Sequence, residues 1–295
     1  MEFRPIEIND YEKASAIMYS AGIENCEHCF PTMLEWSFRH NIQIAIEENT
    51  VFMRSKGRKH MWYLFPRGAM DRKKATDMIL SDAAQQGMPI SIYGVDEETA
   101  LFLQENYGHI LNVTEERDGA DYIYRTTDLA TLPGKNYQKK RNHVSRFIRE
   151  NPDYKFIVMT QDNIHRAKQF ITDWNSKYNP EDSWDLHIEQ QGIFRLLDNY
   201  CTLKLMGAMI ETDGQIVAIT IAAPINQRMV DIMVEKAYHE INGAYAIINR
   251  DFAQNCLAQF EFINREDDMG LENLRKAKLS YFPYEIRKKY LAQSR

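Results

Sequence analysis

Residues 203–237 read LKLMGAMIETDGQIVAITIAAPINQRMVDIMVEKA. Apolar residues alternate with polar or small ones in three runs, which predicts strands at 203–210, 215–222 and 229–235. The dipeptide Asp213-Gly214 lies between the first two runs and is a strong signal for a tight turn. We therefore expect the first two strands to form a hairpin, followed by a third strand.

The elements predicted around these strands follow an order that occurs twice in the chain. A strand and two helices precede the three strands, and a helix, a strand and a further helix follow them. The first half has the same order, although the two halves share negligible sequence identity. Residues 126–133 interrupt the periodicity and are predicted to link two domains, residues 1–130 and 131–295.

The composition is that of a globular protein, with 44% hydrophobic residues, 26% charged residues and a net charge of −6. No apolar run approaches the roughly 20 residues that cross a bilayer, and MEFRPIEIND at the start shows no secretory signal. Four cysteines do not make a disulfide framework. We expect a cytoplasmic protein without a transmembrane segment, which can still be peripheral at a membrane.

The pair Cys26 and Cys29 has the spacing of half a zinc site, but a structural zinc ion needs four ligands. His28 offers at most a third local ligand, and the other two cysteines stand alone in the sequence. No metal site is therefore predicted.

Two basic segments stand out in this acidic chain. Residues 135–149 hold six Lys or Arg and no acid, and residues 272–289 hold six Lys or Arg and two acids. Each segment can be a solvated helix face or a surface that binds phosphates. The candidates for substrate phosphates in the first segment are Lys135, Lys139, Lys140 and Arg141.

Residues 263–292 place polar side chains where a predicted strand meets a predicted helix. Gly270 turns the chain into this helix, and Pro283 ends it. Polar groups at such a junction can converge on a substrate, although Asp267 and Asp268 can also simply cap the helix. The candidate substrate-binding residues here are Asn264, Arg265, Glu266 and Asp268.

Two stretches of the second half form longer patterns, and a Glu-Lys pair ends a predicted strand. The residues are Gly134, Lys135, Lys140, Arg141 and Asn142; Asn264, Arg265, Glu266, Asp268, Gly270, Leu274, Arg275, Lys276 and Lys278; and Glu235 with Lys236. In these residues the chain resembles an uncharacterised bacterial family that shares the C-terminal domain of phosphatidylglycerol lysyltransferases. The resemblance implies an α+β fold of two tandem acyl-CoA N-acyltransferase-like (GNAT-like) domains. Each has a mixed, mostly antiparallel sheet flanked by helices, and the second domain is expected to be active.

The implied activity is transfer of an aminoacyl group from charged tRNA to a lipid head group or another amine or hydroxyl acceptor. Asp231 and Glu235 are expected on one face of their strand, because side chains alternate. Either can act as a general base or hold the α-amino group of the donor, or be an ordinary surface carboxylate. The remaining candidates, for phosphate or oxyanion contacts, are Lys236, Arg275 and Lys278.

Two departures from known patterns leave alternatives open. The lysyltransferases carry many membrane spans before this domain and this chain carries none, which leaves a lipid acceptor open. Acetyl-CoA enzymes of this fold hold the pyrophosphate with a Gln/Arg-x-x-Gly-x-Gly/Ala loop at a helix N-terminus, but residues 239–245, HEINGAY, keep one glycine. The donor is thus expected to be aminoacyl-tRNA, with an acyl-CoA-dependent N-acyltransferase acting on a small amine as the alternative. A non-catalytic binding protein of the same fold is the third possibility.

Overall fold

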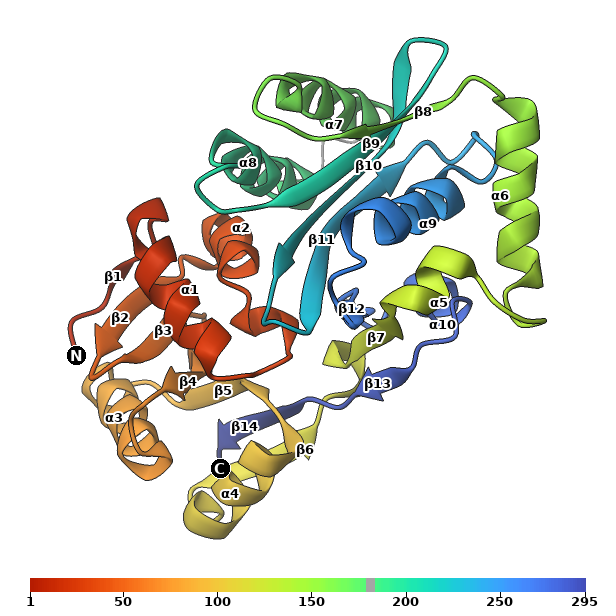
Figure 1. Cartoon of the computed structure of the whole chain (residues 1–295). Helices are drawn as coiled ribbons and strands as arrows, with labels where there is room; N and C mark the ends of the chain where they lie inside the picture. Colours follow the sequence, from red (N-terminus) through yellow and green to blue (C-terminus); the bar gives the residue numbers. More distant parts are fainter. Residues whose placement is uncertain (179–183) are drawn as a thin grey trace.

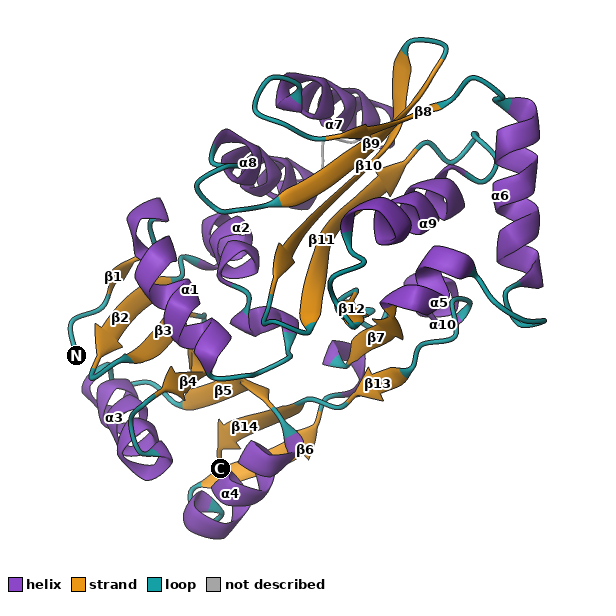
Figure 2. Cartoon of the chain, in the orientation of Figure 1, coloured by secondary structure: helices purple, strands orange, loops and turns teal. Residues whose placement is uncertain are grey.

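The computed structural model describes residues 1–178 and 184–295. These residues form two seven-stranded sheets, each flanked by helices (Figure 1, Figure 2). The expected α+β class with two mixed, mostly antiparallel sheets is therefore confirmed. No helix in the described part of the chain combines the length and apolar character needed to cross a membrane.

The first sheet is antiparallel except where β4 pairs with β5. In spatial order its strands are β1 (Arg4–Pro5), β2 (Gln43–Glu47), β3 (Thr50–Lys56), β4 (Met61–Gly68), β5 (Ile90–Val95), β14 (Tyr290–Ser294) and β6 (Leu111–Glu115). Its helices are α1 (Tyr11–Ser20), α2 (Phe30–His40), α3 (Arg72–Gln85) and α4 (Glu97–Tyr107). Asp71 and Asp96 cap α3 and α4 by accepting hydrogen bonds from backbone amides of the first turn.

The second sheet is antiparallel except where β11 pairs with β12. In spatial order its strands are β13 (Glu285–Arg287), β7 (Asp121–Arg125), β12 (Phe262–Asn264), β11 (Met229–Ala237), β10 (Gln215–Pro224), β9 (Met206–Thr212) and β8 (Lys155–Val158). The helices are α5 (Thr126–Thr131), α6 (Gln138–Glu150), α7 (Ile164–Tyr178), α8 (Trp184–Asp198), α9 (Ala244–Cys256) and α10 (Glu272–Leu279). Asp213 and Gly214 both have positive φ, which is the turn expected for the β9–β10 hairpin.

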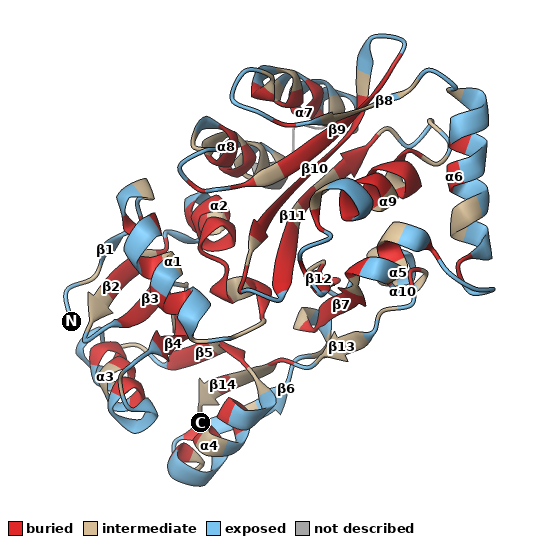
Figure 3. Ribbon diagram, viewed as in Figure 1, coloured by how far each residue is buried: buried red, intermediate tan, exposed pale blue. Residues whose placement is uncertain are grey.

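The second sheet is covered on both faces, and its central strands are the most deeply buried (Figure 3). Side chains of α7 and α8 pack on the face that also meets the first part of the chain, while α5, α6 and α9 pack on the other. Helix α8 lies so close to α2 that a Cβ on Gly192 would stand 2.6 Å from the carbonyl oxygen of Glu35. The small residue allows this contact between the two halves.

The two sheets exchange strands near the predicted domain boundary. Strand β7 precedes residue 130 but pairs in the second sheet, and β14 at the C-terminus lies between β5 and β6 of the first sheet (Figure 1). The division into residues 1–130 and 131–295 stays a prediction. The linker predicted at Thr126–Pro133 is wrong, because residues 126–131 form α5 and bury Leu129. A helix of six residues is too short to show a hydrophobic periodicity.

The buried ammonium group of Lys289 connects the exchanged strands β7 and β14 with the segment before α2. Lys289, just before β14, is 2% exposed and lies 2.6 Å from Asp121 and 2.7 Å from Glu27. Its Nζ also lies 3.3 Å from the Cys26 Sγ. Asp121 begins β7 of the second sheet, whereas Cys26 and Glu27 precede α2. This contact therefore links three distant parts of the sequence.

We expect Lys289→Met to destabilise the fold by about 3–5 kcal/mol, because it leaves buried carboxylates without their cation. The measurement is the urea midpoint of the purified protein. Lys288→Met is the matched control, since Lys288 is 53% exposed and pairs with Glu115 on the surface. That control should cost about 1 kcal/mol or less. Equal shifts for both variants would contradict the structural role of Lys289.

Candidate active site

A β-bulge changes which side chains of β11 share a face. Ile221 of β10 pairs with Val234 and the next residue, Ala222, pairs with Ile232, so Met233 is an extra residue. Asp231 therefore faces α2 and the first half, while Glu235 faces α9. The prediction that Asp231 and Glu235 lie on one face is wrong, because simple alternation does not hold across a bulge.

The strands β11 and β12 separate at this point. They are paired over only three residues, ending at Asp231 and Asn264, and β11 continues to Ala237 without this neighbour. The residues that follow β12 thus diverge from β11. Asp231, Glu235, Arg265 and Glu266 lie at or just beyond this separation.

On the face toward the first half, three carboxyl groups come together. Asp231 is fully buried, and its Oδ2 accepts a hydrogen bond of 2.9 Å from the Thr32 hydroxyl of α2. Its Oδ1 has no hydrogen-bond partner. Glu35, one turn along α2, is 4% exposed, and Glu266 follows β12. Burial raises the pKa of Asp231 and of Glu35, and the neighbouring carboxylate of Glu266 raises both further.

The backbone around Glu266 is held in an unusual conformation. Glu266 has φ of 55°, a left-handed value that non-glycine residues seldom adopt. Its amide donates a hydrogen bond of 2.7 Å to the Asn264 side chain, and its carbonyl accepts one of 3.1 Å from the Tyr122 amide. Burial raises the pKa of Glu266 to about 8, against the opposing effect of Lys278. This carboxyl group therefore gains or loses its proton near neutral pH.

Within the described residues, none of these three carboxylates forms an ion pair with Lys or Arg. The cation on the same face is Lys236, which pairs with Glu189 of α8 at 3.0 Å and lies 4.2 Å from the Trp174 ring centre. On this face, burial without a paired cation favours the protonated form of the three carboxyl groups, and a positively charged ligand group would favour their ionised form.

On the opposite face of β11, the charges are paired. Arg265 lies 2.7 Å from Glu235, whose other oxygen accepts a hydrogen bond of 3.1 Å from Asn249 of α9. Lys140 of α6 lies 3.5 Å from the Tyr281 ring centre, and Arg265 lies 4.9 Å from it. Burial lowers the pKa of Lys140 to about 8, and the charge of Arg265 lowers it too.

Helix α6 also covers the N-terminus of α9, where an acyl-CoA enzyme of this fold would bind the pyrophosphate. Gly243, the residue before α9, has φ of 82°, and a Cβ there would stand 2.4 Å from the His143 carbonyl oxygen of α6. An electronegative carbonyl group thus faces the helix end at which an anion would have to sit. This arrangement does not favour the acyl-CoA alternative.

Three further candidates brace the loop after β12. Asp268 is fully buried and binds Arg275 through two hydrogen bonds of 2.8 Å, which hold its pKa well below the usual range. The Lys278 ammonium donates hydrogen bonds to the backbone carbonyls of Arg265 and Asp267. These contacts hold the turn that presents Glu266.

The candidates on the basic segment fall into two groups. Lys135 and Lys139 are exposed, and no ion pair or hydrogen bond of their side chains occurs in the described structure. Arg141 donates hydrogen bonds to the carbonyls of Leu132 and Gly134, so it holds the chain before α6. Lys140 is half-buried and lies against Tyr281 beside Arg265. Two of the four residues thus face solvent, where a phosphate could reach them.

Sequence reasoning missed the residues that the first half contributes. Thr32 and Glu35 lie one turn apart on α2. Two polar residues at this spacing among apolar ones could have indicated that α2 contributes to the site. Asp121 and Lys289 carried no such signal, because their partners are distant in the sequence.

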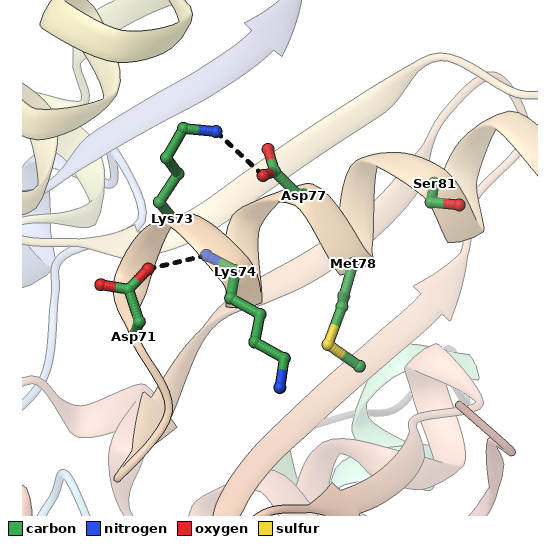
Figure 4. A pocket seen from close by; sticks show the side chains of 6 residues that line it. All are labelled: Asp71, Lys73, Lys74, Asp77, Met78 and Ser81. Carbon is green, nitrogen blue, oxygen red and sulfur yellow. Dashed lines mark hydrogen bonds and ion pairs between the residues drawn. The ribbon is translucent and has the colours of Figure 1, made fainter.

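Two other features do not form the site. Cys26, Glu27 and Asp121 offer ligand atoms within 4.8 Å of one another, but Lys289 already contacts all three. The depression in Figure 4 lies on the outer surface of α3, and Lys73 and Asp77 pair across it at 3.0 Å. It has no candidate residue in its lining.

Comparison with known proteins identifies the family. The sequence pattern described as phosphatidylglycerol lysyltransferase, C-terminal, matches residues 21–293. The chain belongs to this family. The resemblance inferred from the motifs is therefore confirmed, and the family is linked to aminoacyl transfer.

Solved structures with this fold include a conserved protein of unknown function from Bacteroides thetaiotaomicron. It is 34% identical, and the match covers 100% of both chains with a TM-score of 0.94. The C-terminal domain of a putative lysylphosphatidylglycerol synthetase from Agrobacterium fabrum is 15% identical, with 97% of this chain and 91% of that chain covered and a TM-score of 0.70. A tandem GNAT protein from the clavulanic acid biosynthesis pathway is 8% identical, with 100% and 98% covered and a TM-score of 0.53. The tandem GNAT-like fold is thereby confirmed.

An uncharacterized protein of Mycoplasmoides gallisepticum is a curated relative, 26% identical over 174 residues. The match covers 59% of this chain and 56% of that protein, so the chain matches little more than half of the relative's length.

The raised pKa of Glu266 has a measurable consequence for stability. Below about pH 4.5 the group is protonated in both states; between there and pH 8 the folded state binds the extra proton, so stability falls as pH rises. We expect Glu266→Gln to raise Tm by several degrees at pH 8.5 and by much less at pH 5. Glu272→Gln, at an exposed position of α10, is the control and should show no such pH dependence. A constant offset at both pH values would contradict the assignment.

Proposed function

We propose that this chain is an aminoacyltransferase that moves an aminoacyl group from charged tRNA to an amine or hydroxyl acceptor, such as a lipid head group. The observation that carries the proposal is the carboxyl centre formed by the buried Asp231 and Glu35 and the half-buried Glu266. An aminoacyl ester brings a positively charged α-amino group, and a buried carboxylate without a cation is its natural partner. The family match supports the same reaction class.

The residues suit distinct steps of this reaction. The free Oδ1 of Asp231 would accept a hydrogen bond from the α-ammonium group of the donor. The ionised form of Glu266, whose pKa is about 8, would take the proton from the acceptor as the acceptor's oxygen or nitrogen attacks the ester carbonyl carbon. The bond from this carbon to the terminal ribose oxygen of tRNA then breaks, and the same carboxyl group can return the proton to that oxygen.

The donor would approach over α6, which lies on the outer side of the second half (Figure 1). Lys135 and Lys139 are solvent-exposed near its start. Phosphates of the tRNA end can be neutralised there. The proposal thus assigns binding to the exposed basic residues and chemistry to the buried acidic ones.

Asp231→Asn should lower kcat/KM for aminoacyl transfer roughly 100-fold to 1,000-fold, because the amide cannot compensate the ammonium charge. The assay follows a radiolabelled aminoacyl group from tRNA into phosphatidylglycerol vesicles or into a panel of small amines. Asp213→Asn in the β9–β10 turn keeps the same chemical change away from the site and should retain full activity. Transfer at the wild-type rate by Asp231→Asn would overturn the role of this residue.

Lys135→Ala with Lys139→Ala should weaken binding of charged tRNA about three- to tenfold at low salt. It should also reduce the slope of log K against log salt concentration by about 1–2, as expected for two lost phosphate contacts. Lys56→Ala with Lys59→Ala removes the same charge from the exposed β3–β4 turn and is the control. An equal effect of both pairs would mean non-specific attraction. Saturable binding of acetyl-CoA in place of tRNA would favour the acyl-CoA alternative.

A further inference from the structure

A cavity lies beside the carboxyl centre, between α1, the first turn of α2 with the segment before it, and the end of β10. Its volume is about 250 Å³. Most of its lining is apolar, with Met18, Phe30 and Pro31 from the first half and Ala223 and Ile225 from the second. Glu12 and Lys204 pair at 3.4 Å among its lining residues, and both are largely exposed. The charged groups of the lining are thus neutralised by each other.

Two unsatisfied polar atoms belong to residues of this lining. His28 is 2% exposed, and its Nε2 lies 3.5 Å from the Phe65 carbonyl oxygen. A carbonyl can only accept, so Nε2 carries the proton in this contact. Burial lowers the pKa of His28 to about 3, and the charge of Arg67 lowers it too, so the ring is neutral and Nδ1 is an acceptor. Nδ1 has no partner, and neither has the buried Ser15 hydroxyl oxygen.

We propose that this cavity binds a small, neutral, mainly apolar molecule that bears a hydroxyl group, and that His28 Nδ1 accepts the hydrogen bond of that hydroxyl. A buried acceptor without a partner is unfavourable, and a ligand hydroxyl that donates to it would remove that cost. An apolar cavity of about 150 Å³ is enough for benzene. The larger volume here suits a substituted single ring or an alkyl alcohol of similar size.

The cavity and the carboxyl centre are adjacent at two points but suit different kinds of ligand. Ala223 lines the cavity and pairs with Asp231 across β10 and β11. Pro31 lines it too, and the next residue, Thr32, donates the hydrogen bond to Asp231. The carboxyl centre suits a cation, whereas the cavity suits a neutral molecule. The inference rests on binding alone and does not depend on the proposed transfer reaction.

The test compares 4-ethylphenol with ethylbenzene, which have nearly the same shape but differ by one hydroxyl. The full chain, labelled with ¹⁵N, is titrated with each probe, and Kd is taken from the shifts of amide signals around Ser15 and Ala16. We expect 4-ethylphenol to bind several-fold more tightly. Binding by apolar contact alone gives the opposite order, because the hydrocarbon gains more on leaving water.

Two variants locate the site. Ala16 is an exposed lining residue of α1, so Ala16→Phe should fill the mouth of the cavity without disturbing the core and abolish binding. Ala84→Phe makes the same change at an exposed position of α3 and should bind like the wild type. His28→Phe should reverse the preference between the two probes. Absence of shifts up to the solubility limit, preference for ethylbenzene, or undiminished binding by Ala16→Phe would each overturn the proposal.

Discussion

The parallel pairing of β11 with β12 extends over three residues, and the arrangement of the site depends on this short contact. Because the strands separate after Asp231 and Asn264, the residues beyond them have no strand neighbour on that side. Side chains fill the opening from both faces of the sheet. If the pairing were longer, the backbone of residues 265 and 266 would form hydrogen bonds with β11. Glu266 would then be part of an extended strand and would not adopt its left-handed conformation.

Because β11 and β12 separate, the side chains of Arg265 and Glu266 lie on different faces of the sheet. Asn264 is buried and donates hydrogen bonds to Asp121 and to the Glu24 carbonyl, which fixes the strand end. Arg265 pairs with Glu235 on the α9 side, whereas the carboxylate of Glu266 acts on Glu35 of α2. One face is therefore neutralised by ion pairs and the other keeps unpaired carboxyl groups. A ligand with a positive charge is favoured on the second face only.

Much of the fold was predictable from sequence because it is encoded locally. The β9–β10 hairpin, the capped helices α3 and α4 and the motif after β12 all depend on neighbours within a few residues. The site was predictable only in part. Strand periodicity identified Asp231 as a candidate. Its position on the opposite face from Glu235 depends on a β-bulge, which no residue type in the sequence indicates. Glu35 and Lys289 were missed because their partners come from the other half of the chain.

The site depends on residues from both halves of the chain, and the exchanged strands hold these halves together. Thr32 and Glu35 come from the first half, and Asp231 and Glu266 from the second, so a small shift between the halves would break the hydrogen bond between Thr32 and Asp231. Strand β14 in the first sheet and β7 in the second prevent this shift by ordinary backbone pairing. Lys289 adds a charge contact where these segments meet, and Asp121 connects it to Asn264 at the end of β12. The same contact that holds the halves together therefore also fixes the strand end from which Glu266 projects.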